Sequence, residues 1–447
     1  MKETDKYYFL SSLLFLALSS SNSEEVNSIL YPSFLLLFLF YGIIRKKSLV
    51  ELYFLVYFFS LEILAESAYI NIINSIPIFV MLIDLLILKS KSRRKPKHFI
   101  AVFSAVMLLL GMSKSISMLR FDIDFYSLAN LTVLLVIIYY YFHTFSMVNY
   151  VNLLNTFVLI SFFVSLRVLL AFITGENLLN SDSQVSFENA EIYGYIFRAT
   201  YFISSYFFVI GFGCIVSVYY FIYEKSFFWM LGIALTLSVI LLNINISAII
   251  GLLIALIYLL ISLKKLSLKI ILIAVPVIII MGSSILSLLP YGDLVISRLK
   301  FEDVSSLFFR FVVFAGALNV YVSDFVLFLF GTGTEATLRF SNFELIQSIK
   351  YNSAALKSEG AIDSNWLTLL IENGIFLFAI VMTLLVKALT SKNKGSFSIL
   401  NRSLLMFFSV TGLTQIFMYA KVGSIFYLIL SSAFLLKHTY DYSGRCK

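Results

Sequence analysis

The chain has 447 residues, of which 60% are hydrophobic, 17% aromatic and 13% charged. So few charges cannot cover so much apolar surface in water, so the composition excludes an ordinary soluble domain and predicts a membrane protein. The net charge is +8, and the basic residues lie mostly in short segments between apolar runs. This pattern is typical of membrane anchoring and does not indicate a nucleic-acid partner.

Apolar runs long enough to cross a bilayer recur along the whole chain. We predict an all-α, polytopic transmembrane protein of about fourteen helices. The first run, 7–18, could also be a cleavable signal peptide. The predicted spans are 7–20, 29–44, 49–66, 71–88, 99–112, 128–142, 151–173, 198–223, 227–243, 247–263, 270–289, 364–387, 403–420 and 423–437.

Lysine and arginine mark one side of the predicted membrane. They collect in the segments 45–47, 89–97, 264–265 and 392–394, and in the C-terminal tail. Short cytoplasmic loops carry the positive excess of a membrane protein. We therefore expect this side, with both termini, to be cytoplasmic.

Three regions follow from these spans. Residues 1–289 hold the first eleven predicted helices, 290–363 form one large outer loop, and 364–447 hold the last three helices and a cytoplasmic tail. Within the loop, 311–330 is apolar, but counting it as a span would place the basic segment 387–402 outside. An interfacial or re-entrant helix is therefore expected there.

Cysteine and histidine usage indicates neither a disulfide framework nor a metal site. Cys214 and Cys446 stand far apart in the chain. His98, His143 and His438 stand singly, without the spacing that a zinc site needs.

Arginines recur on the predicted outer side, at Arg198, Arg298, Arg310 and Arg339, and Arg167 lies near the outer end of a span. A guanidinium group remains charged and binds phosphate oxygens through paired donors. Such a cluster would suit a phosphate-bearing substrate at the membrane surface. Contact with lipid headgroups is the alternative for any one of them, and we favour a functional role for Arg198 and Arg310.

Two carboxylates flank the outer start of the span 364–387. Asp363 and Glu372 are nine residues apart, which would place them on roughly opposite sides of a regular helix. A carboxylate in this position can act as a general base on a sugar hydroxyl. Alternatively, Asp363 caps the helix and Glu372 pairs with a neighbouring cation.

The segment 363–374 resembles a motif of the membrane polymerases and ligases of bacterial surface polysaccharide, roughly His/Asp-Asn-x-x-Leu-x-x-Leu-x-Glu-x-Gly. Arg310, followed by an apolar helix and Gly331-x-Gly333, resembles the loop element of that family, and Arg198 resembles its other recurring arginine. Ligases generally have histidine where Asp363 stands, which favours a polymerase. The residues that match the motif are Asp363, Leu367, Leu370, Glu372 and Gly374.

The resemblance implies an O-antigen polymerase of the Wzy type in the bacterial inner membrane. Such an enzyme transfers a growing glycan from its polyprenyl pyrophosphate carrier to a new lipid-linked repeat unit on the periplasmic face. Because the carrier is itself the leaving group, no cofactor, nucleotide sugar or metal is expected. The expected partners are the lipid-linked oligosaccharide and membrane lipid, and a chain-length regulator protein is a further candidate.

The resemblance also implies roles for the candidate residues. Arg198 and Arg310 would hold the pyrophosphate, helped by Arg298 or Arg339, and Asp363 would act on the acceptor hydroxyl. Two alternatives stay open. One is an O-antigen ligase, and the other is a flippase, which the charges at Glu62, Glu66, Asp84 and Arg167 in or near predicted spans would suit.

Overall fold

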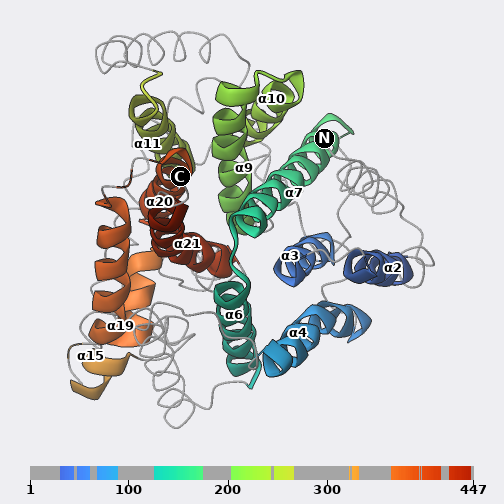
Figure 1. Ribbon diagram of the computed structural model, residues 1–447, viewed down its shortest axis with the longest axis vertical. Coiled ribbons are helices and arrows are strands. Elements are labelled where there is room, and N and C mark those ends of the chain that lie inside the picture. The colour runs from blue at the N-terminus through green and yellow to red at the C-terminus, as the bar shows by residue number, and fades with distance from the viewer. Residues whose placement is uncertain are drawn as a thin grey trace, which may run out of the picture.

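The computed structural model describes residues 31–44, 48–60, 68–88, 125–174, 203–242, 246–265, 322, 325–331, 364–391, 393, 395–413 and 422–443. The elements in these residues are all α-helices, and the described part of the chain contains no strand (Figure 1). The predicted all-α class is therefore confirmed. Its physical reason is that a helix satisfies the backbone hydrogen bonds of an apolar run within the run itself.

The described helices follow the predicted spans closely. They are α2 (Tyr31–Ile44), α3 (Leu49–Ser60), α4 (Ala68–Leu88), α6 (Phe125–Thr144), α7 (Met147–Thr174), α9 (Ile203–Glu224), α10 (Phe227–Leu242), α11 (Ile246–Ser262), α15 (Phe325–Phe330), α19 (Asn365–Leu389), α20 (Ser396–Thr411) and α21 (Val422–Ser443). The predicted spans 7–20, 99–112 and 270–289 lie outside the described residues.

One predicted boundary is wrong. The sequence predicts a span over 403–420, but α20 begins at Ser396 and ends at Thr411. Asn401 and Arg402 resemble loop residues in the sequence. In the structure both belong to the helix, because the Asn401 side chain hydrogen-bonds within the helix bundle and Arg402 hydrogen-bonds the turn that precedes α20.

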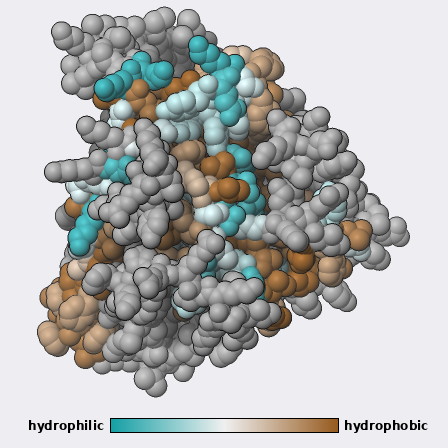
Figure 2. Space-filling view, viewed as in Figure 1, coloured by the Kyte–Doolittle hydropathy of each residue, from teal (hydrophilic) through white to brown (hydrophobic). Residues whose placement is uncertain are grey.

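Two described helices are long and apolar enough to cross a bilayer, namely Met147–Leu166 within α7 and Asn365–Leu389. This agrees with a membrane protein but does not establish the predicted number of spans. Exposed apolar side chains are also frequent on α10 and α11, where Phe227 is 72% exposed and Leu253 is 50% exposed. Figure 2 shows apolar residues over large areas of the described surface, a pattern that soluble monomers rarely have.

Contacts near the ends of several helices show which turns lie together. Tyr219, near the end of α9, donates a hydrogen bond to Ser396 at the start of α20, with an oxygen–oxygen distance of 3.0 Å. The Arg402 guanidinium of α20 lies 5.8 Å from the ring centre of Tyr258, near the end of α11. The turns after α9, α11 and α19 therefore lie together.

We call this end the basic end. Its described lysines are exposed and come from the α9–α10 turn, the residues that follow α11, and the last turn of α19. They are Lys225, Lys264, Lys265 and Lys387. Of the basic segments that predict the cytoplasmic side, the structure describes 264–265, which lies at this end; 45–47, 89–97, Lys392 and Lys394 lie outside the described residues.

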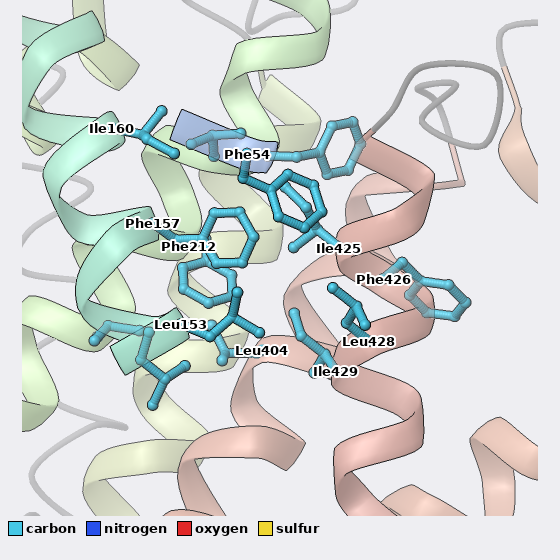
Figure 3. Packing of buried hydrophobic residues seen from close by; sticks show 14 of the residues in the cluster. Phe54, Leu153, Phe157, Ile160, Phe212, Leu404, Ile425, Phe426, Leu428 and Ile429 are labelled. Atoms are coloured by element: carbon cyan, nitrogen blue, oxygen red, sulfur yellow. The ribbon is translucent and has the colours of Figure 1, made fainter. Parts of the chain in front are cut away.

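The middle of the bundle is packed with aromatic rings from different helices (Figure 3). Phe157 of α7 contacts Phe54 of α3 and Phe212 of α9, in each case edge to face with ring centres 5.0 Å apart. All three side chains are at most 1% exposed. This geometry is favourable for aromatic pairs and joins the first helices to the centre of the bundle.

Candidate functional site

Helix α19 begins at the end of the bundle opposite the basic end, where it is tied to the end of α20. The Asn365 backbone N–H donates to the Gly412 carbonyl at 2.8 Å. The Trp366 indole Nε1–H donates to the Ser409 carbonyl at 2.9 Å. Ser364 holds the N-cap position with an extended backbone, so the alternative in which Asp363 caps this helix is wrong by one residue.

The first two turns of α19 carry a buried polar face. Asn365, Thr368 and Glu372 are spaced three and four residues apart, which places them on one side of a helix. Asn365 is 0% exposed, and Thr368 and Glu372 are each 1% exposed. A carboxyl group is costly to bury in an apolar helix, so such a group marks a candidate functional site.

The helix is broken directly after this polar face. Gly374 has φ 77° and ψ 170°, so α19 consists of two helical segments, 365–373 and 375–389. A residue with a Cβ atom rarely adopts this backbone conformation, whereas glycine adopts it readily. In membrane proteins, non-helical backbone at this depth is tolerated where it is buried in protein or lines a cavity.

The short helix α15 packs against the break. It belongs to the predicted outer loop and is followed by Gly331, which has φ 85°. A Cβ atom on Gly331 would overlap the carbonyl group of Glu372, and one on Gly374 would overlap the carbonyl group of Leu329. The two backbones are thus in direct contact. Figure 1 shows α15 and α19 together at one edge of the molecule.

This contact bears on the interfacial helix that we expect over 311–330. Of that range, the structure describes residue 322 and α15, and α15 is helical as expected. The ring of Phe330 lies 6.0 Å from the ring of Phe376, which follows the break, centre to centre. A helix of the predicted outer loop therefore packs on α19 on both sides of its break.

Among the predicted site residues, Glu372 is the one whose side chain the structure places. Arg167 lies within α7, and its side chain is outside the described set. Five further residues lie outside the described residues, so the predicted arginine cluster and the general base remain predictions. They are Asp363, Arg198, Arg298, Arg310 and Arg339.

The other charged and metal-ligating candidates have ordinary surroundings where the structure describes them. Asp84 accepts a hydrogen bond of 2.6 Å from the Tyr140 hydroxyl, which is the helix-to-helix contact expected of a structural carboxylate. His143 packs edge to face on Tyr139 with ring centres 4.4 Å apart. Cys214 is a buried free thiol. The described residues contain no group of three or more His, Cys, Asp or Glu that could hold a metal ion.

Sequence reasoning missed part of this site. Asn365 and Thr368 could have been found from their helical spacing to Glu372, because residues seven apart share a helix face. The contact between Gly331 and Gly374 had no comparable signal, since it joins two segments that are separate in the sequence.

No protein-family model matches this chain, and no curated protein matches its sequence.

Proposed function

We propose that this protein is a polytopic membrane glycosyltransferase of about fourteen spans that polymerises a lipid-linked surface polysaccharide, as O-antigen polymerases of the Wzy type do. The observation that carries the proposal is the fully buried Glu372, on the polar face of an apolar helix that breaks against an outer-loop helix. The same residue and the glycine at the break match the polysaccharide polymerase motif.

The exposed lysines of the basic end support the proposed topology. With the exposed lysines of the basic end in the cytoplasm, the broken part of α19 faces the periplasmic side of a bacterial inner membrane. Lipid-linked repeat units are polymerised on that side in the proposed reaction. The exposed apolar side chains of α10 and α11 then contact lipid hydrocarbon.

The polar face of α19 is suited to a sugar and not to a pyrophosphate. Asn365, Thr368 and Glu372 offer an amide, a hydroxyl and a carboxyl group, which can donate to and accept from sugar hydroxyls. A carboxylate would repel a pyrophosphate, whereas arginines attract it. We therefore assign the α19 face to the acceptor sugar.

We assign the pyrophosphate of the carrier to the predicted outer arginines. Arg198 and Arg310, with Arg298, Arg339 and Arg167, bind the pyrophosphate and stabilise the charge that it gains. Asp363 accepts the proton of the acceptor hydroxyl. The hydroxyl oxygen bonds to the anomeric carbon of the carrier-linked glycan, the bond from that carbon to the pyrophosphate oxygen breaks, and polyprenyl pyrophosphate leaves.

The deciding experiment is the polysaccharide ladder of cells that lack this protein, complemented with the wild-type chain or with the Asp363→Asn or Arg310→Ala variant. A polymerase predicts core bearing a single repeat unit in the deletion strain and in both variants, with long chains restored by the wild type. Polymer that accumulates on its lipid carrier would instead identify a ligase. Repeat units trapped on the cytoplasmic face would identify a flippase.

A further inference from the structure

We infer that Gly331 and Gly374 form a backbone contact through which α15 positions Glu372 for the acceptor sugar. The effect on the reaction rests on the proposed function, whereas the contact itself does not. Gly331 and Gly374 are thus positioning residues, since both act through the carboxylate of Glu372.

The contact is specific in its backbone geometry. Among the described glycines, Gly331 and Gly374 alone have positive φ, at 85° and 77°. Each lies where an added Cβ atom would overlap main-chain atoms of the other segment. The atoms that it would overlap belong to the main chain and cannot rotate away as the end of a flexible side chain can. Any larger residue at either position must therefore push the two segments apart.

The contact is made at Glu372, the residue on which the proposed site depends. Gly331 lies against the carbonyl of Glu372 itself and the backbone nitrogen of Asn373. At the other end of the same helical segment, Asn365 and Trp366 hydrogen-bond the last turn of α20 and the residue that follows it. Segment 365–373 is therefore fixed at both ends, by α20 at its start and by α15 at its end.

The helix break makes this arrangement adjustable. Because Gly374 interrupts the helix, segment 365–373 need not move together with 375–389. A displacement of α15 therefore acts directly on the end of segment 365–373, where the Glu372 carbonyl lies against Gly331. A misplacement of about 1 Å in a reacting group can reduce a rate by about a hundredfold, so the contact is expected to control turnover.

The geometry is tested first by cross-linking in native membranes. Phe330 and Phe376 flank the contact with ring centres 6.0 Å apart, and we replace both by cysteine in a chain carrying Cys214→Ala and Cys446→Ser. A short bifunctional thiol reagent should cross-link the Phe330→Cys/Phe376→Cys chain and neither single variant. Absence of an internal cross-link would overturn the contact.

The positioning role is tested by the initial rate of polymer formation per amount of protein in membranes, using purified lipid-linked repeat unit. Gly331→Ala and Gly374→Ala should each lower the rate about tenfold or more. Gly42→Ala is the control for an added Cβ atom, because the three atoms nearest to that Cβ all belong to the side chain of Leu52 on α3. This control should retain the wild-type rate.

A second background separates positioning from general damage to the fold. In a chain carrying Glu372→Gln, Gly331→Ala should cause little further loss of rate, because the carboxylate through which it acts is already absent. An equal loss in both backgrounds would overturn the positioning role.

The outcomes for the inference and for the proposed function are distinct. A Phe330→Cys/Phe376→Cys chain that forms the cross-link, together with a wild-type chain that makes no polymer from the lipid-linked unit, refutes the polymerase and leaves the contact intact. An active polymerase whose glycine variants behave like Gly42→Ala refutes the positioning role and leaves the function intact.

Discussion

The two ends of the bundle use polar residues in different ways. At the basic end, the Tyr150 hydroxyl donates to the Asn401 side-chain oxygen at 3.0 Å, and the Asn401 side-chain nitrogen donates to the Ile429 carbonyl at 2.9 Å. These bonds join α7, α20 and α21. At the opposite end, Glu372 lies on a polar face beside the break in α19 and against Gly331, which follows α15.

Arg402 completes the contrast. Its guanidinium nitrogens donate to the carbonyls of Ser391 at 2.6 Å, Asn393 at 2.7 Å and Ser398 at 3.3 Å, which closes the turn between α19 and α20. Here a cation in a helix has a structural purpose that its surroundings fully explain. Glu372 and Arg402 thus differ in their backbone surroundings, because the helix is broken at Gly374 beside Glu372, whereas Arg402 lies within α20.

The strongest test of this contrast replaces one carboxyl group by an amide at each end of the bundle. If the proposed function is correct, Glu372→Gln should reduce polymer formation by about a hundredfold, because the amide keeps the shape but replaces one carboxyl oxygen by an NH₂ donor and so misplaces the acceptor hydroxyl. Glu224→Gln, which alters the carboxylate that accepts the Trp229 indole N–H at 2.6 Å near the basic end, should leave the rate unchanged. Chain-length ladders at matched protein levels measure both. Equal rates for the two variants would remove Glu372 from the site.

Asn401→Leu should have the largest effect on stability at the basic end. The change removes two buried hydrogen bonds and leaves the Ile429 carbonyl and the Tyr150 hydroxyl without them, which costs about 2 kcal/mol of the free energy of unfolding. Thermal unfolding of the purified protein in detergent measures the loss. Tyr150→Phe, which removes one of the two bonds, should cost less than Asn401→Leu, and the reverse order would show that the Asn401 amide contributes little.

Arg402→Gln should loosen the α19–α20 turn locally. Loss of the two short bonds to Ser391 and Asn393 lowers the free energy of local opening by about 1–2 kcal/mol, which should raise the rate of tryptic cleavage at Lys392 or Lys394 roughly tenfold. Gel analysis of limited proteolysis follows the fragments. A cleavage rate equal to that of the wild type would mean that the turn is held by other contacts.

The smallest expected effect belongs to Tyr141→Phe. The Tyr141 hydroxyl lies 2.7 Å from the Ser432 hydroxyl, which also donates to the Leu428 carbonyl within its own helix. Ser432 thus keeps a partner, and the loss should be about 0.6 kcal/mol, the average for such bonds between membrane helices. The same thermal unfolding assay applies, and a loss as large as that of Asn401→Leu would contradict this ranking of the contacts at the basic end.

Part of the site followed from the sequence. Glu372 stands out because a carboxylate is rare in an apolar run, and the structure buries it on one face with Asn365 and Thr368. Asp84 stands out for the same reason, yet its bond to Tyr140 is an ordinary contact between helices. Identical sequence signals therefore led to different environments, because the partner of each carboxylate comes from another part of the chain.

The sequence by itself determined the all-α class and the approximate positions of the described helices, because long apolar runs must satisfy their backbone within a helix. The tertiary structure alone decided where α20 begins, which polar residues are tied at the basic end, and that α19 breaks at Gly374 against α15. These features depend on contacts between distant segments and on the backbone angles of single glycines. Hydrophobic periodicity carries no information about either.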